Sequence, residues 1–280
     1  MPILLALGSA MVWGIGDYFG GRVSRFHPAV IVTFLGQAVS LVLLAVAVWA
    51  MGTPIPDAST LLWGGTAGVV GCLALTGLYY AFARGAMTVV APVSAVVGAV
   101  VPVVVGLATG ERPRAIAYAG IAVAIVAVAL VSGALGERHQ PTPRRILFIS
   151  ALAGSGFGFF FVALDRTAHD SGFWPLLASR VTSVPLLLAI VVFTGARAGK
   201  ERSLLVLAAA GGVLDVTANA LYLAATRNGL LSIVAVVGSM YPASTVLLAF
   251  AVDRERVNRW QAFGMVLAGV ALVLVTLGRQ

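Results

Sequence analysis

The chain has 280 residues, of which 60% are hydrophobic and only 10% are charged, and its formal net charge is +8. Ordinary soluble domains carry about 25% charged residues, so this composition excludes a water-soluble protein that covers its surface with charge. The basic excess does not indicate a nucleic-acid partner, because Arg and Lys gather in the loops beside the bilayer in membrane proteins.

Ten apolar runs of about 20 residues follow one another, and each is long enough to cross a bilayer as a helix. No basic segment precedes the first run, so we expect a retained helix there and not a cleaved signal peptide. The breaks between the runs are short and contain nearly all the charges and turn residues. The sequence therefore predicts an all-α membrane protein with ten transmembrane helices, at residues 2–21, 28–50, 60–83, 86–108, 114–134, 145–164, 172–194, 203–226, 229–250 and 259–277.

The second half of the chain repeats the first. The pattern Leu-Tyr-x-Ala-x-x-Arg begins at Leu78 and again at Leu221, an offset of 143 residues, and a Glu-Arg pair follows each copy. A polar linker at 133–145 divides the chain into two five-helix repeats, residues 1–138 and 144–280. Because five is an odd number, the second repeat enters the membrane from the opposite side. Such inverted repeats are typical of secondary transporters, which bind substrate near the midplane where the repeats meet.

The chain resembles the EamA-type drug/metabolite transporters over nearly its whole length. The resemblance rests on ten spans in two halves, Trp13-Gly14 in the first span, the segment from Pro242 to Glu255, and the Glu-Arg pattern before spans five and ten. It implies a cell-membrane transporter of small metabolites, amino acids or drugs, driven by an ion gradient and needing no cofactor. It also implies that spans one to four and six to nine surround a cavity, with five and ten at the periphery.

Asp215 lies almost at the centre of the eighth span. A charge inside the membrane costs about 2.5–3.5 kcal/mol on insertion scales and is a functional hypothesis by default. Asn219 and Tyr222 follow at i+4 and i+7 on the same helical face, and the duplicated positions in span three include Thr76 and Tyr79. We expect Asp215 to couple transport to protons or another ion and these neighbours to bind substrate. The alternative is a structural hydrogen bond or ion pair.

Two further ionisable residues lie within the spans. Arg180, whose duplicate position is Gln37, is a candidate to bind a carboxylate or phosphate of the substrate through paired hydrogen bonds; alternatively, it only neutralises an aspartate. Asp17, nearer the end of span one, is a second candidate for ion coupling, and Trp13 lies one turn earlier and could stack on substrate.

Spans one and six are rich in glycine, and matching interrupted helices point to a transporter site. Close helix packing explains the same residues, because small residues four apart let helices approach. These residues form the pairs Gly16 and Gly20, Gly64 and Gly68, and Gly154 and Gly158. We also expect prolines to kink spans four and nine, namely Pro92, Pro102 and Pro242.

Motifs for hydrolases and P-loop enzymes are missing from the sequence, and Cys72, the only cysteine, excludes a thiolate metal cluster. We therefore expect no metal site and no enzyme; the partners are a small-molecule substrate, a coupling ion and the bilayer. We expect the protein to be a monomer or a homodimer. Two other functions stay open: flipping of a lipid-linked substrate, and intramembrane catalysis if Asp17 and Asp215 meet.

The orientation in the membrane also stays open. The odd-numbered loops with their flanking helix ends carry twelve Arg and Lys residues, and the other side carries five. This bias places the odd-numbered loops in the cytoplasm and both termini outside, whereas the family resemblance implies that both termini are inside.

Overall fold

The computed structural model describes residues 2–108, 114–131, 142–197, 199, 202–228, 241–255 and 257–277. All regular structure in these residues is helical, and no strand occurs among them. The ten helices are α1 (Pro2–Val23), α2 (Ala29–Met51), α3 (Ala58–Phe82), α4 (Met87–Ala108), α5 (Ala115–Val131), α6 (Arg144–Asp165), α7 (Trp174–Thr194), α8 (Arg202–Asn228), α10 (Pro242–Ala251) and α11 (Arg259–Leu277).

Helix ends differ from the predicted spans by a few residues, for local reasons. The Asp57 carboxylate accepts a hydrogen bond from the Thr60 N–H at 3.2 Å and caps α3, so this helix starts two residues earlier than predicted. Gly172 has a positive φ of 60° in the turn before α7, which delays the start of that helix. Pro242, expected to kink the ninth span, is the first residue of α10. Residues 229–240 of that span and most of the predicted linker lie outside the described residues.

Five of the described helices are long and apolar enough to cross a membrane: Ala29–Met51, Ala58–Phe82, Arg144–Asp165, Trp174–Thr194 and Val206–Ala225. Large apolar side chains point outward from them, and Trp49 and Phe193 are 83% and 90% exposed. Exposure on this scale would be unfavourable in water and suits contact with lipid chains.

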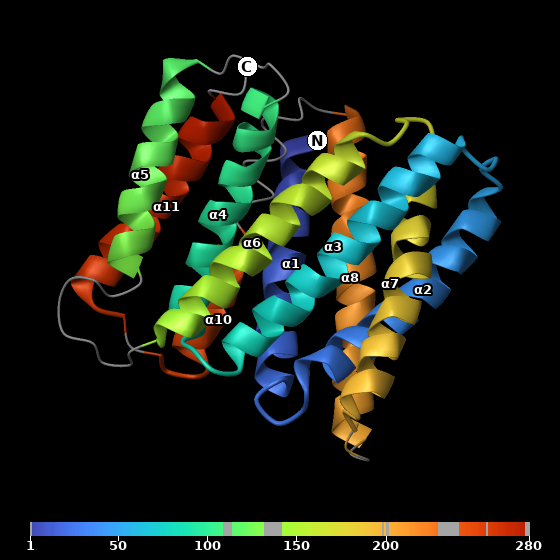
Figure 1. Ribbon diagram of the computed structural model, residues 1–280, viewed down its shortest axis with the longest axis horizontal. Helices are drawn as coiled ribbons and strands as arrows, with labels where there is room; N and C mark the ends of the chain where they lie inside the picture. Colours follow the sequence, from blue (N-terminus) through green and yellow to red (C-terminus); the bar gives the residue numbers. More distant parts are fainter. Residues whose placement is uncertain are drawn as a thin grey trace.

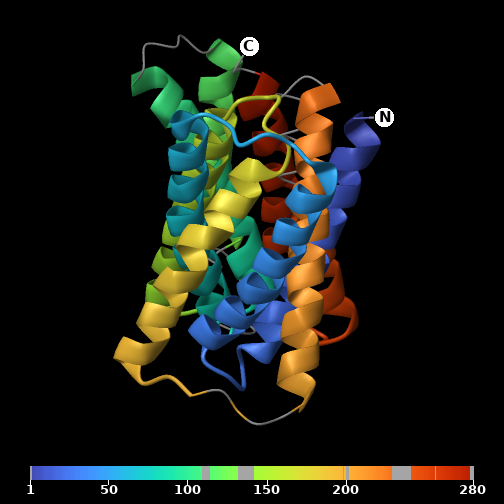
Figure 2. The same cartoon turned by 90° about the vertical axis from the view of Figure 1, so that its right-hand side faces the viewer.

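The helices form one elongated bundle, and both termini lie at the same end of it (Figures 1 and 2). Helix α1 runs away from that end and α6 runs towards it (Figure 1). The packing pairs recur when the two halves are exchanged: α1 packs on α8 as α6 does on α3, and α3 packs on α7 as α8 does on α2. Helices α5 and α11 pack on each other at one edge of the bundle (Figure 1).

Small residues allow some of these contacts to be very close. A Cβ at Gly68 of α3 would collide with the Ser179 carbonyl oxygen of α7, and one at Gly154 of α6 would collide with the Ser94 carbonyl oxygen of α4. Close packing therefore explains these two glycines. Gly16 differs, because the nearest non-local atom to its Cβ position is a Leu214 carbon at 3.6 Å.

A buried carboxylate joins the halves at the end opposite to the termini. Glu255, which is 6% exposed, accepts hydrogen bonds from the backbone N–H groups of Met87 at 3.1 Å and Thr88 at 2.9 Å. These groups open α4 and have no intrahelical acceptor, so the carboxylate satisfies them and complements the helix dipole. Arg25 pairs with the same carboxylate at 3.3 Å. The segment after α10 is thereby fixed to α4 and to the loop after α1.

Candidate functional site

A pocket of about 100 Å³ lies between α1, α2, α3, α6, α7 and α8, with Tyr241 from the start of α10 closing one side. This volume has room for several water molecules, since one water molecule needs about 10–15 Å³ of such space. Among the described residues, α4, α5 and α11 contribute none to its lining. Seven of the nine residues predicted for the site line the pocket: Trp13, Asp17, Gln37, Tyr79, Arg180, Asp215 and Asn219.

Arg180 and Asp215 form an ion pair across the pocket, with Nη2 of the arginine 2.6 Å from Oδ2 of the aspartate. The arginine side chain is 4% exposed and the aspartate 23% exposed. A charge-assisted hydrogen bond this short is among the stronger polar contacts in proteins. The structure therefore joins two residues for which the residue pattern predicts separate roles, in the pairing that the alternative for Arg180 describes.

Three neighbours complete this cluster. The Ser40 hydroxyl donates to Asp215 Oδ2 at 2.9 Å and accepts from Arg180 Nε at 3.1 Å. The Asn219 amide donates to Asp215 Oδ1 at 3.0 Å, and Arg180 Nη1 donates to the Ser179 hydroxyl at 3.1 Å. Both carboxylate oxygens and all three guanidinium nitrogens thus have protein partners. Protonation of Asp215 would remove the anion that holds Arg180 in this position.

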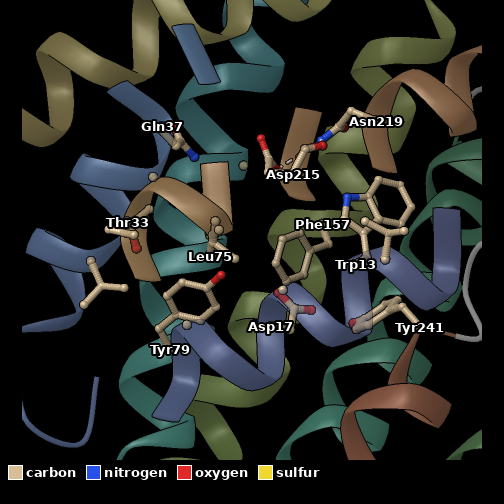
Figure 3. A pocket seen from close by; sticks show the side chains of 18 of the residues that line it. Trp13, Asp17, Thr33, Gln37, Leu75, Tyr79, Phe157, Asp215, Asn219 and Tyr241 are labelled. Carbon is tan, nitrogen blue, oxygen red and sulfur yellow. Dashed lines mark hydrogen bonds between the residues drawn. The ribbon is translucent and has the colours of Figure 1, made fainter. Parts of the chain in front are cut away.

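Asp17 is the second carboxylate in the pocket and is 9% exposed. It forms no hydrogen bond or ion pair with the residues that the structure describes. Figure 3 shows it between the phenols of Tyr79 and Tyr241, on the side of the pocket away from Asp215 and Asn219.

Two glycines of α1 explain how these tyrosines reach Asp17. A Cβ at Gly20 would collide with the ring of Tyr79, and a Cβ at Gly14 would collide with the Tyr241 carbonyl oxygen. The Thr245 hydroxyl also donates to the Gly14 carbonyl at 2.9 Å, which holds α10 against α1. The glycine-rich sequence of the first span therefore allows one aromatic ring and one backbone segment to approach on either side of a buried acid.

Aromatic rings close the pocket towards the end that carries the termini. Trp13 lies with its ring centroid 5.9 Å from Phe161 and 5.4 Å from Tyr222, and Phe161 and Tyr222 are also 5.4 Å apart. Tyr222, predicted to bind substrate, lies behind Trp13 and Phe161 and is not part of the lining. Thr76 is not part of it either, and its hydroxyl donates to the Cys72 carbonyl at 2.8 Å.

Several residues of the site were not predicted from the sequence. Ser40, which bridges the ion pair, lies three residues after Gln37 on the same face of α2, so the i+3 spacing could have identified it. Phe157 and Tyr241 had no such signal, because aromatic residues are common in apolar spans and only packing decides which of them face a cavity.

Comparison with known proteins gives the family. The model of the EamA-like transporter family matches residues 1–133 and 144–277. A search of curated protein sequences found no match for the chain. A solved structure titled "Crystal structure of protein" is 15% identical, with a TM-score of 0.67, and the match covers 98% of this chain and 96% of that one. At this identity the likeness shows the fold alone. The chain therefore belongs to the EamA-like transporter family and is a multi-pass membrane transporter of small molecules.

Proposed function

We propose that the protein is a secondary active transporter that moves a small polar or amphipathic metabolite across the cell membrane by alternating access, driven by an ion gradient. The observation that carries this proposal is the pocket itself. It lies where helices of both halves meet, it contains two carboxylates and an arginine inside an apolar bundle, and residues of this kind mark substrate and ion pathways in membrane proteins.

Two inverted repeats would supply the two states that such a transporter needs. The recurrence of packing pairs on exchange of the halves and the opposite directions of α1 and α6 support this arrangement (Figure 1). The pocket lining reaches Val23 at the end of α1 and Val32 near the start of α2, whereas aromatic rings meet towards the termini. We assign this state to access from the end opposite the termini.

Ion coupling is proposed to act through Asp215. A proton on this carboxylate would cancel its charge and release Arg180, which could then bind an anionic group or reposition α7 against α8. Binding of a proton and movement of the helices would thus be linked through one equilibrium, as transport by a gradient requires. Gln37, Tyr79 and Asn219 are proposed to contact the substrate from the pocket wall.

Flux into proteoliposomes tests this function. A panel of amino acids, nucleosides and cationic drugs is first screened by thermal shift, because a ligand of the folded state raises its melting temperature. Stabilising compounds are then followed into vesicles with and without a pH gradient. Asp215→Asn should insert and fold but lose gradient-driven uptake, whereas Asp165→Asn, at the exposed end of α6, should behave as the parent. Full gradient-driven uptake by Asp215→Asn would refute the coupling role.

The membrane orientation follows from the charge bias in this proposal. The loops after α1, α3, α7 and α10 lie at the end opposite the termini (Figures 1 and 2), so these four odd-numbered loops share one side. We place that side in the cytoplasm. A reporter fused after Gln280 should then show that the C-terminus lies outside the cytoplasm. Reporter activity in the cytoplasm would instead support the orientation that the family resemblance implies.

A further inference from the structure

We infer that the pocket selects an amphipathic organic cation, whose ammonium group pairs with Asp17 while its apolar body lies against the aromatic wall. This inference names the substrate class for the transport function proposed above and rests on it. It depends on which polar groups of the pocket are already used within the protein and which remain for a ligand.

The cationic donor of the pocket and the amide beside it are committed. Arg180 uses Nε, Nη1 and Nη2 on Ser40, Ser179 and Asp215. The Asn219 amide donates twice to Asp215, to the backbone carbonyl at 2.8 Å and to Oδ1 at 3.0 Å. While Asp215 is ionised, an anionic ligand would have to take these donors from it, which would leave that carboxylate unpaired at a large cost.

One acceptor, in contrast, remains. Asp17 lines the pocket, is 9% exposed, and has no hydrogen-bond or ion-pair partner in the described part of the chain. A buried acceptor without a donor is unfavourable, and a ligand that brings N–H groups would satisfy it. An ammonium carries such donors together with the opposite charge.

The net charge of the pocket points the same way. Arg180 and Asp215 cancel, so a cation that ionises Asp17 would leave no uncompensated charge among the lining residues that the structure describes, whereas an anion would add one. A carboxylate in a low-dielectric cavity binds a cation strongly, because little water screens the attraction.

The remaining wall suits an apolar body attached to that cation. Trp13, Leu75, Tyr79, Phe157 and Tyr241 surround Asp17 in the view of Figure 3. Aromatic faces attract a cation directly and also pack on apolar groups. A compound with one ammonium and one ring or short apolar chain therefore fits the site better than a doubly charged or fully polar one.

A matched ligand series tests this class on the full chain purified in detergent. Phenethylamine, phenylalanine, 3-phenylpropionate and 2-phenylethanol share a phenyl ring and differ as cation, zwitterion, anion and neutral molecule. Binding is measured by isothermal titration calorimetry. Phenethylamine should bind at least tenfold tighter than the other three. Equal or tighter binding of any of the other three would overturn the inference.

Variants assign the binding to the carboxylate. Asp17→Asn should lose the preference for phenethylamine over phenylethanol, Asp17→Glu should keep it, and the matched control Asp165→Asn should bind as the parent. An unchanged preference in Asp17→Asn would overturn the assignment. If that variant does not fold, Asp17→Ser replaces it with the same expectation, and an unchanged preference would again overturn the assignment.

Flux separates this inference from the transport function on which it rests. Each of the four compounds is followed into proteoliposomes. Selective binding of phenethylamine without flux of any compound would support the cation site and overturn transport. Flux of phenylpropionate or phenylethanol in preference to phenethylamine would support transport and overturn the cation class.

Discussion

The ion pair between Arg180 and Asp215 gives the sharpest test of the structure. Arg180→Met removes the guanidinium and leaves the Asp215 carboxylate inside the bundle. Breaking a buried pair from one side costs about 3–5 kcal/mol. Asp215 is 23% exposed to the pocket and keeps Ser40 and Asn219 as donors, so we expect the low end of that range, about 3 kcal/mol.

The double variant decides whether this cost comes from the pair. Arg180→Met with Asp215→Leu removes both charges, and replacing a whole buried pair by apolar residues is often neutral or stabilising. The double variant should therefore be more stable than Arg180→Met alone, with a coupling energy of about 2 kcal/mol in the double-mutant cycle. Unfolding free energies are measured by denaturant titration in detergent micelles.

A matched surface change controls for loss of a basic residue. Arg166→Met, at the exposed C-cap of α6, should lie within about 0.5 kcal/mol of the parent. If the two single changes simply add in the double variant, the pair does not form in the folded protein, and the coupling mechanism proposed here has no structural basis.

Three other predictions concern the fold. Gly154→Ala should destabilise the protein by about 1–3 kcal/mol, because the added Cβ meets the carbonyl oxygen of Ser94. Gly269→Ala, with nothing within 4 Å of its Cβ position, should be neutral or stabilising by up to about 1 kcal/mol. Equal losses of unfolding free energy in denaturant titration would contradict the close packing at Gly154. Glu255→Gln should cost about 1–3 kcal/mol by losing charge-assisted bonds to α4, and an unchanged melting temperature would exclude the capping role. Hydrogen bonds from Thr60, first from its side chain and then from its backbone, lower the pKa of Asp57 below 3.8, so the carboxylate stabilises α3 above that pH and loses this effect as the pH falls through its folded pKa. The difference in melting temperature between the parent and Asp57→Ala should shrink on acidification, and a constant difference would contradict the assignment.

The sequence alone determined the helical architecture and much of the pocket. In lipid, an uninterrupted apolar run must pair its backbone N–H and C=O groups within the helix, so the described helices follow the predicted spans closely. Charges inside such runs are costly, and for that reason Asp17, Arg180 and Asp215 stand out from their positions in the chain alone. Periodicity then added Asn219 to the face of Asp215.

Only the tertiary structure decided which of these groups meet. Helical periodicity orients a side chain within its own helix and contains no information on which neighbour it will face, so two separate roles for Arg180 and Asp215 became one ion pair bridged by Ser40. The same limit applies to Tyr222, which carries the correct spacing on α8 but lies behind Trp13. Asp17 remained without a partner in the described part of the chain because Gly20 admits the ring of Tyr79, Gly14 admits the backbone of Tyr241, and neither neighbour is basic. That outcome depends on packing between helices far apart in the sequence.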